Sequence, residues 1–362
     1  MTLRIAFVRT ISGFTELREP WQDLWSRAGG SIFQHHDWLH GWMAGIQTRR
    51  DIRILVALAW HDTTLVAAMP LAVHRRHGVR MLCWAGQLFS DYCDALTDRE
   101  TVLPELWQAV LAAGGFDVIK LQQVRPDAAC RSVLQAGPLA SADRHERCMR
   151  IDIRWNSGAE FFRSLNKKGR NNHTRGKRIL GEIGSEPVFR LIEPDRDATP
   201  MFDEIWRLKE AWLRVNDPAS PLLGTDRVVQ RSVLDGAWRT GLTRIFLIEC
   251  GGQVAAASVN FVYANRMEAY LTAYDARFER ASPGTILIVE YTQWACDRGL
   301  AHVDFLRGDE AFKSRLANAE TILTGYQGAR TLLGHLATSG HRLLSRRRGT
   351  MEAAPAKELE PV

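Results

Sequence analysis

Hydrophobic residues recur along the chain with two different periodicities, and these predict its secondary structure. Apolar residues that alternate with polar ones, or that form short runs between turn residues, are typical of strands. Apolar residues that recur every three or four positions mark one face of a helix. In the first half these patterns predict strands at 4–10, 51–60, 63–76, 79–86 and 116–124, helices at 14–29, 31–46 and 100–115, and tight turns at His61-Asp62 and His77-Gly78.

The second half repeats this order of elements without obvious sequence identity. Its first helical stretch, 157–184, fits either one long helix or two short ones. Thr225 is the expected N-cap of a later helix. The patterns predict strands at 145–153, 186–192, 242–250, 252–263, 266–275, 301–306 and 320–327, further helices at 198–216, 225–241, from Pro283 towards Gly299 and at 329–344, and hairpin turns at Gly251-Gly252 and Ala264-Asn265.

This repetition predicts two similar α+β units in tandem, each with a mixed, mostly antiparallel sheet flanked by helices. A length of 362 residues also suits two domains. We place the boundary near Cys148, which gives an N-terminal domain at 1–147 and a C-terminal domain at 148–345. The tail at 346–362 lacks core residues and is expected to be disordered.

Composition narrows the class of protein. The 46% hydrophobic and 24% charged content is typical of a soluble globular protein, and no apolar run approaches the ~18 residues that would cross a bilayer. The N-terminus lacks the apolar stretch of a signal peptide, so we predict a cytoplasmic protein without a transmembrane segment. The net charge of +6 favours anionic partners but is too small to indicate nucleic acid. The six scattered cysteines fit neither a zinc site nor disulfides, so we predict no metal and free, buried thiols.

A Ser-Pro-Gly turn at 282–284 opens one of the predicted helices. Pro283 suits a first helical turn, Ser282 is a candidate N-cap, and Gly284 allows a ligand close to the backbone. Free N–H groups at a helix start attract a pyrophosphate, with Arg280 and Thr285 as further contacts. The alternative is an ordinary capped helix that docks on a sheet.

A charged loop follows the next strand. Asp304, Asp309 and Glu310 are candidate catalytic carboxylates that would take a proton from an attacking group. Arg307 and Lys313 beside them are candidates for substrate binding. The alternative is a solvated turn with weak internal ion pairs.

Other candidates lie outside these two segments. A basic run at 167–178 contains Lys168 and Arg170, which would attract an anionic acceptor, or would simply form a solvated helix face. Asp91 and Tyr92 are expected to border a cleft between the units and to contact the acceptor. His36 and His40 have helical i, i+4 spacing but lack the glutamate of a zinc-binding helix, and the tryptophans at 38 and 42 are expected in the core.

The segment 258–316 resembles the GNAT-like acetyltransferases of the CelD/BioF2-like group, which are associated with cellulose and other polysaccharide biosynthesis. The matching features are Tyr274 and Phe278 ahead of Ser282-Pro283-Gly284, and the run 304–310 ahead of Phe312-Lys313. At the position of Phe312 the family usually has an aromatic residue, often tyrosine. The stretches 31–46 and 165–180 also match, so the resemblance covers most of 33–316.

The resemblance implies two tandem GNAT-like domains, related to Fem-type aminoacyl transferases. It implies that 280–284 occupies the place of the Gly-rich loop that binds coenzyme A, with Tyr274 among the substrate contacts. The implied function is transfer of an acyl group, most simply acetyl, from acyl-CoA to a hydroxyl or amine of a polysaccharide or cell-envelope precursor. The acceptor attacks the thioester directly, without a covalent enzyme intermediate.

In this hypothesis the N-terminal domain has no cofactor of its own, and the partners are a small-molecule or glycan acceptor and polysaccharide synthesis machinery. Two alternatives stay open. One is a Fem-type transferase that uses aminoacyl-tRNA, the only case in which a nucleic acid would be a partner. The other is a catalytically silent scaffold in polysaccharide synthesis.

Overall fold

The computed structural model describes residues 3–137, 139–141, 146–194, 197–308 and 310–339. Its first half, up to Ser141, is a mostly antiparallel sheet with helices on both faces. The elements are β1 (Leu3–Val8), α1 (Ile11–Thr15), α2 (Arg18–Ala28), the 3-10 helix η1 (Ile32–Gln34), α3 (His36–Gly45), β2 (Ile52–His61), β3 (Thr64–Arg76), β4 (Val79–Trp84), β5 (Leu96–Thr97), η2 (Glu100–Val102), α4 (Leu103–Ala113), β6 (Val118–Val124), α5 (Arg131–Ala136) and β7 (Ala140–Ser141).

The second half begins with a strand at Glu146 and has a similar order of elements. They are β8 (Glu146–Asp152), α6 (Gly158–Ser164), α7 (Lys167–Ile183), β9 (Val188–Ile192), α8 (Thr199–Asn216), η3 (Pro221–Leu223), α9 (Asp226–Arg239), β10 (Thr243–Cys250), β11 (Gln253–Tyr263), β12 (Arg266–Tyr274), η4 (Ala276–Ala281), α10 (Pro283–Asp297), β13 (His302–Arg307), α11 (Ala311–Leu316) and β14 (Ala319–Ala329).

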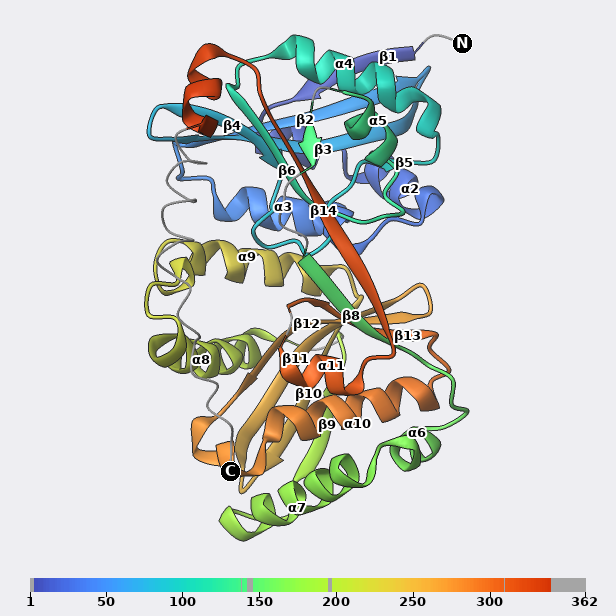
Figure 1. The fold of residues 1–362 in the computed structure, drawn as a ribbon, viewed down its shortest axis with the longest axis vertical. Coiled ribbons are helices and arrows are strands. Elements are labelled where there is room, and N and C mark those ends of the chain that lie inside the picture. Colours follow the sequence, from blue (N-terminus) through green and yellow to red (C-terminus); the bar gives the residue numbers. More distant parts are fainter. Residues whose placement is uncertain (1–2, 138, 142–145, 195–196, 309, 340–362) are drawn as a thin grey trace.

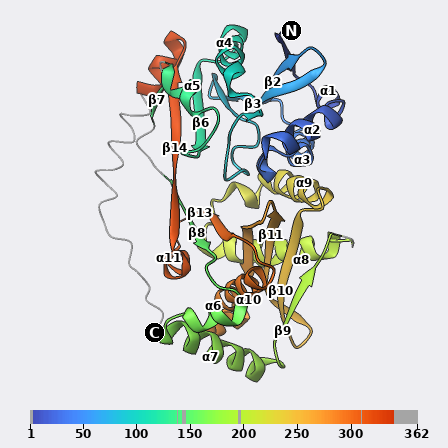
Figure 2. The same cartoon turned by 90° about the vertical axis from the view of Figure 1, so that its right-hand side faces the viewer.

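Within the described residues the strands form one continuous sheet along the molecule (Figure 1). Its order is β1-β2-β3-β4-β6-β14-β8-β13-β12-β11-β10-β9, with β5 beside β3 and β7 beside β14. The neighbours are antiparallel except for the parallel pairs β4–β6 and β12–β13. The long strand β14 pairs with β6 of the first half and with β8 of the second, so it joins the two halves (Figure 2).

Two helices from different halves touch almost backbone to backbone. A Cβ added to Gly236 of α9 would lie 2.2 Å from the carbonyl oxygen of Asp37 in α3. Gly41 and Gly45 of α3 face Ser232 and Val229 of α9 in the same way. This contact belongs to one buried core that contains Trp38 and Trp42 and spans both halves, which confirms the prediction for these two side chains. Glycine is required here because any side chain would push the helices apart.

Each half has a further core on the opposite face of the sheet. In the first half α4 and α5 cover this face, and in the second half α6, α7 and α10 cover it. All six cysteines are free and buried, as predicted from their apolar surroundings. No described helix is long and apolar enough to cross a membrane.

The predicted strands and their turns are confirmed, while several helices differ in detail. Hairpins form at the four predicted turns, where Asp62, His77, Gly251 and Ala264 all have positive φ. The stretch 14–29 is interrupted at Leu17 between α1 and α2, and 31–46 begins as a 3-10 turn before α3. The stretch 157–184 is two helices, because Asn166 is extended and caps α7 through the amide of Gly169.

The predictions for the start of α9 and for the C-terminal helix are met only in part. Thr225 stands at the N-cap position of α9 but makes no capping hydrogen bond through its side chain. Residues 332–339 are helical, whereas the rest of the helix predicted at 329–344 and the tail at 346–362 lie outside the described residues. The division into domains at Cys148 stays a prediction.

Candidate active site between the two halves

Six polar residues face the same side of three adjacent strands in the second half. Alternate positions of a strand share one face, and the register aligns these positions in two rows. The first row is Arg266 on β12, His302 on β13 and Asp152 on β8, and the second is Glu268, Asp304 and Arg150 on the same strands.

The residues between them face the other way. Met267, Val303 and Ile151 are buried in the core beneath α10. The face with Met267, Val303 and Ile151 therefore packs against the core, and the face with the six polar residues is free to contact a ligand. Hydrophobic burial on one side fixes the register, and the register presents the six polar side chains together on the other side.

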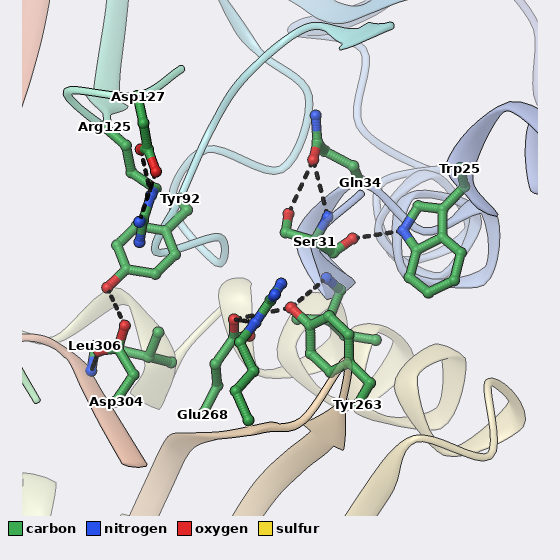
Figure 3. Close-up of polar contacts among 12 residues, drawn as sticks. Trp25, Ser31, Gln34, Tyr92, Arg125, Asp127, Tyr263, Glu268, Asp304 and Leu306 are labelled. Carbon is green, nitrogen blue, oxygen red and sulfur yellow. Dashed lines mark hydrogen bonds and ion pairs between the residues drawn. The ribbon is translucent and has the colours of Figure 1, made fainter. Parts of the chain in front are cut away.

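Segments of the first half cover part of this polar face and enclose a cavity of about 360 Å³. Figure 3 shows Ser31 and Gln34 on one side, with Tyr92, Arg125 and Asp127 on another, above Glu268 and Asp304. Trp25 donates to the carbonyl of Ser31 at 2.7 Å, and Gln34 accepts from the amide of Ser31 at 3.0 Å, so this wall is rigidly held. The volume is at the lower end of the ~300–1,000 Å³ usual for small-molecule sites.

Glu268 is the carboxylate with spare acceptor capacity. Its Oε1 accepts from the Tyr263 hydroxyl at 2.8 Å and from Arg266 Nε at 3.1 Å, while its Oε2 is buried without a partner among the described residues. The pKa of Glu268 is raised to about 7, chiefly by burial and also by the charge of Asp304, while Arg266 opposes the shift. A carboxylate that titrates near neutral pH suits a general base.

Asp304, the neighbour of Glu268 on β13, is almost saturated with hydrogen bonds. The Tyr92 hydroxyl donates to its Oδ2 at 2.7 Å, and the amide of Leu306 donates to its Oδ1 at 2.8 Å. Burial raises the pKa of Asp304, although both hydrogen bonds oppose the shift. Leu306 has a φ of 55°, a left-handed conformation that is strained for a leucine. The backbone is therefore bent where it supplies this hydrogen bond.

The parallel strands β12 and β13 separate immediately beyond these carboxylates. They pair only over 266–268 and 302–304, although β12 continues to Tyr274 and β13 to Arg307. Beyond Glu268 the edge of β12 that faces β13 has no strand partner within the described sheet. β12 also contains an irregularity in its pairing with β11 next to Tyr270. The gap starts at the cavity and opens towards the end of β12.

The Ser-Pro-Gly turn lies at that far end of β12. A Cβ added to Gly284 would be 3.8 Å from the ring of Tyr274, the last residue of the strand. Pro283 occupies the first position of α10, and the amide of Gly284 has no hydrogen-bond partner among the described residues. Ser282 is at the N-cap position, but it is left-handed with a φ of 53° and makes no capping bond through its side chain. The expected serine cap is therefore wrong, and the first turn stays open. Thr285 is bonded through its amide to the carbonyl of Ser282.

The charged loop divides into separate contacts. Arg307 forms an ion pair with Asp91 at 2.6 Å and another with Glu146 at 3.2 Å, so the two predicted substrate contacts Asp91 and Arg307 bind each other. Lys313 is buried, contacts Glu310 at 2.8 Å and donates to the carbonyl of Arg307. Asp309 lies outside the described residues. Among the described residues of β13 and this loop, His302 and Asp304 line the cavity, and those after Asp304 do not.

The remaining predicted residues surround the Ser-Pro-Gly turn or the helix next to it. α7 packs against the turn through Gly176, whose added Cβ would lie 2.4 Å from the carbonyl oxygen of Ala281. Arg280 and Lys168 are exposed and have no ion-pair partner among the described residues. Arg170 donates to the carbonyls of Arg163 and Leu165 at the end of α6, so its guanidinium is partly engaged within the protein.

Most of the residues that line the cavity were not predicted from the sequence. Glu268, Arg266, His302, Arg150 and Arg125 were not singled out. A signal was present, since R-x-E, H-x-D and R-x-D occur in three predicted strands at the two-residue spacing that places both residues on one face. Tyr92 and Asp304 were selected separately and are in direct contact. Among the described residues, no group of three or more His, Cys, Asp or Glu is arranged to hold a metal.

Comparison with known proteins agrees with this arrangement. Residues 167–314 match the acetyltransferase (GNAT) domain family, and no curated protein matches the chain by sequence. The chain is similar to FemX, with 11% identity and a TM-score of 0.56 over 91% of this chain and 98% of that one. It is similar to the C-terminal domain of a protein from Agrobacterium fabrum named as a lysylphosphatidylglycerol synthetase, with 13% identity and a TM-score of 0.54 over 91% and 97%. It is also similar to a tandem GNAT protein from the clavulanic acid biosynthesis pathway, with 11% identity and a TM-score of 0.50 over 90% and 98%.

These findings define the class of protein. The chain has the tandem GNAT fold of the α+β class that was predicted, and it is an acyltransferase of the GNAT type. Its second half contains the matching GNAT domain, with β12, the Ser-Pro-Gly turn, α10 and β13 in one continuous segment. The finer resemblance to the CelD/BioF2-like group stays a prediction.

Proposed function

We propose that the protein transfers an acyl group, acetyl in the simplest case, from acyl-CoA to a small acceptor in the cavity. The diphosphate of coenzyme A binds at the open start of α10, where the amide of Gly284 has no partner among the described residues, with Arg280 of the preceding turn as a nearby cation. From there to Glu268, β12 spans six residues, or roughly 20 Å. The phosphopantetheine arm is comparably long, and the gap between β12 and β13 offers unpaired backbone groups to its amides.

In this proposal the reaction takes place where the two strands separate. The hydroxyl or amine of the acceptor attacks the thioester carbonyl, and a new C–O or C–N bond forms. The proton of the acceptor passes to Glu268 Oε2, the C–S bond breaks, and coenzyme A leaves as a thiolate. The proton held by Glu268 then passes to this thiolate, directly or through water, which gives the thiol and restores the base. Unpaired N–H groups along the β12 edge stabilise the oxyanion. Asp304 and Tyr92 position the acceptor next to Glu268.

The observation that carries this proposal is the buried Oε2 of Glu268, which lacks a partner at the point where β12 and β13 diverge. A buried carboxylate oxygen without a hydrogen bond destabilises a fold, so its presence indicates a use. Asp309 and Glu310 are weaker candidates for the base: Glu310 contacts Lys313 outside the cavity lining, and nothing described supports Asp309.

The resemblance to polysaccharide-associated acetyltransferases leads us to propose a precursor of a polysaccharide or of the cell envelope as the acceptor. A cavity of about 360 Å³ favours a monomeric precursor over a finished polymer. The fold shared with FemX supports a second candidate, transfer of an aminoacyl group from tRNA. In that case the exposed basic helix α7, beside the start of α10, would contact the RNA backbone. A silent scaffold is less favoured, because it gives no reason for the unpaired Glu268.

Calorimetry with acetyl-CoA tests the donor site. We expect the full chain to bind acetyl-CoA and the Gly284→Trp variant to lose at least about tenfold in affinity, because the indole would occupy the space above the turn. The matched control is Gly137→Trp, at the end of α5 in the first half, where the nearest atoms to an added Cβ are 3.9 Å away. Equal binding by Gly284→Trp and the wild type would contradict the proposed site. Retention of aminoacyl-tRNA without any heat from acetyl-CoA would favour the second candidate.

A further inference from the structure

Three arginines line the cavity, and each is held by a carboxylate two residues further along its own chain segment. Arg125 Nε contacts Asp127 at 2.8 Å, Arg150 Nε contacts Asp152 at 2.7 Å, and Arg266 Nε contacts Glu268 at 3.1 Å. A carboxylate on Nε fixes the plane of a guanidinium and leaves its terminal nitrogens available.

Most of those terminal nitrogens are free to donate hydrogen bonds to a ligand in the cavity. Both terminal nitrogens of Arg150 and one of Arg125 have no hydrogen-bond partner among the described residues, while Arg266 bonds to Glu268 and also to the Tyr263 side chain. Arg125 is further fixed by its position 4.7 Å above the ring of Tyr92, and Arg266 by its position 4.3 Å above the ring of Tyr263. The three guanidinium groups are therefore oriented before any ligand arrives, and this reduces the entropy lost on binding.

His302 lies in the same row of the sheet as Arg266, between β12 and β8. Its ring makes no hydrogen bond among the described residues. Burial lowers the pKa of His302, and the positive charges of Arg150, Arg266 and Arg125 lower it further. The three guanidinium groups and this imidazole therefore line the same small cavity.

The acids that line the cavity do not cancel this set of donors. Asp94 accepts from the amides of Ala95, Ala129 and Cys130, and Asp127 is taken by Arg125. Asp304 is occupied by Tyr92 and Leu306, and Glu100 of the first half is exposed to solvent. Among the carboxylates in the two rows of the sheet that line the cavity, Glu268 is therefore the one with a free oxygen. The wall formed by Arg150, Arg266 and His302 therefore presents donors to a ligand, beside one base.

We infer that the acceptor carries an anionic group, a phosphate or a carboxylate, which binds to Arg150, Arg266 and His302 while its hydroxyl or amine meets Glu268. Arg266 and His302 lie one row from Glu268, roughly 7 Å along the strands, and Arg150 lies in the row of Glu268 but two strands away, at roughly 10 Å. The anionic group and the nucleophile are therefore separated by roughly 7–10 Å. This describes a small phosphorylated or carboxylated alcohol or amine, such as a sugar phosphate. The inference rests on the proposed function, because it assigns the acceptor of the same reaction.

Titration of the full chain with inorganic phosphate, followed by calorimetry, tests the anion site without the donor. The Arg150→Gln variant loses the paired N–H donors of one guanidinium group, and we expect it to bind phosphate at least about tenfold more weakly. Arg147→Gln is the matched control, because Arg147 lies on the same strand β8, is more than half exposed and pairs with Glu320 away from the cavity. The Arg150→Lys variant keeps the positive charge but not the paired donors, so its affinity for phosphate should be intermediate.

The outcomes separate the anion site from the donor site. Phosphate binding that is weakened in Arg150→Gln, unchanged in Arg147→Gln and retained in Gly284→Trp supports the inference. Phosphate binding that survives Arg150→Gln but disappears in Gly284→Trp overturns it, because phosphate then binds at the donor turn. No phosphate binding by the wild type at tens of millimolar also overturns it. Acetyl-CoA binding is measured separately, so a failed donor site would leave the phosphate result intact. Thermal unfolding of Arg150→Gln and Arg150→Lys checks that both are folded.

Discussion

At the scale of single residues, the account depends on Glu268. The residue is buried, one oxygen is held by Tyr263 and Arg266, and the other is unpaired. In the unfolded chain the carboxyl has its ordinary pKa of 4.5, and in the folded chain burial raises the pKa to about 7. The ionised form is therefore destabilised in the fold, which is the expected cost of keeping a base ready in a closed site.

The Glu268→Gln variant is predicted to lose activity and gain stability at pH 8. Because the folded pKa is the higher one, the contribution of Glu268 favours the fold below about pH 4.5 and is lost as the pH rises through 7. A permanently neutral glutamine avoids this loss, so the free energy of unfolding at pH 8 should rise by up to about 3 kcal/mol. With an acceptor that is turned over, kcat should fall by roughly 10²–10⁴. In the wild type, kcat/KM should fall about tenfold per pH unit below 7, and this inflection should vanish in the variant.

Glu290→Gln on α10 is the contrasting control. Burial raises the pKa of Glu290, but the hydrogen bond from His173 and the charge of Lys177 outweigh it, so the net shift is downwards. Its ionised form favours the fold above the ordinary pKa and loses this effect as the pH falls. Glu290→Gln should therefore be less stable at pH 8, opposite in sign to Glu268→Gln. A destabilised Glu268→Gln with an unchanged pH profile would show that Glu268 has a structural role only.

At the scale of elements, the helices α3 and α9 fix how the halves meet. Their contact relies on Gly41, Gly45 and Gly236, because added methyl groups would lie 2.2–2.7 Å from the backbone of the other helix. A cleft residue such as Tyr92 reaches Asp304 only if this contact holds the halves at a fixed distance.

We predict that Gly236→Ala lowers the free energy of unfolding by about 1–3 kcal/mol, since the helices must separate to admit the methyl group. The matched control is Gly181→Ala in α7, where the nearest atom to the added Cβ is 4.0 Å away. Alanine favours a helix, so this control should be neutral or more stable by up to about 1 kcal/mol. Denaturant unfolding of both variants makes the comparison. A neutral Gly236→Ala would mean that the contact between α3 and α9 is loose.

Strands and turns could be predicted from the sequence, whereas one helix cap could not. Periodicity located the strands and hairpin turns, because a strand with one buried face must alternate and a hairpin needs residues that accept positive φ, as at Gly251 and Asn265. The cap at Ser282 was wrong, because the preceding turn of η4 forces this residue into a left-handed conformation in which its side chain cannot cap α10. Local sequence does not reveal such a constraint.

At the scale of the whole molecule, the site forms only where the two halves of the chain meet. Tyr92 and Asp304 are 212 residues apart in sequence, and Ile32 and Tyr263 are 231 apart, yet both pairs are hydrogen-bonded across the two halves. Asp91 and Arg307 form an ion pair over a similar separation. Periodicity and local motifs select chemical types, but the pairing of β14 with both β6 and β8 decides which of them meet. Glu268 was therefore missed although the strand that carries it was predicted.

In the proposed mechanism, the acyl donor runs from the start of α10, between β12 and β13, to Glu268. The most direct test is a crystal structure with an acetyl-CoA analogue in which a methylene group replaces the thioester sulfur. The account predicts a diphosphate oxygen hydrogen-bonded to the amide of Gly284, and a carbonyl carbon within roughly 6–7 Å of Glu268 Oε2, which leaves room for one acceptor atom between them. A diphosphate bound elsewhere, or a carbonyl carbon on the order of 10 Å or more from Glu268, would contradict it.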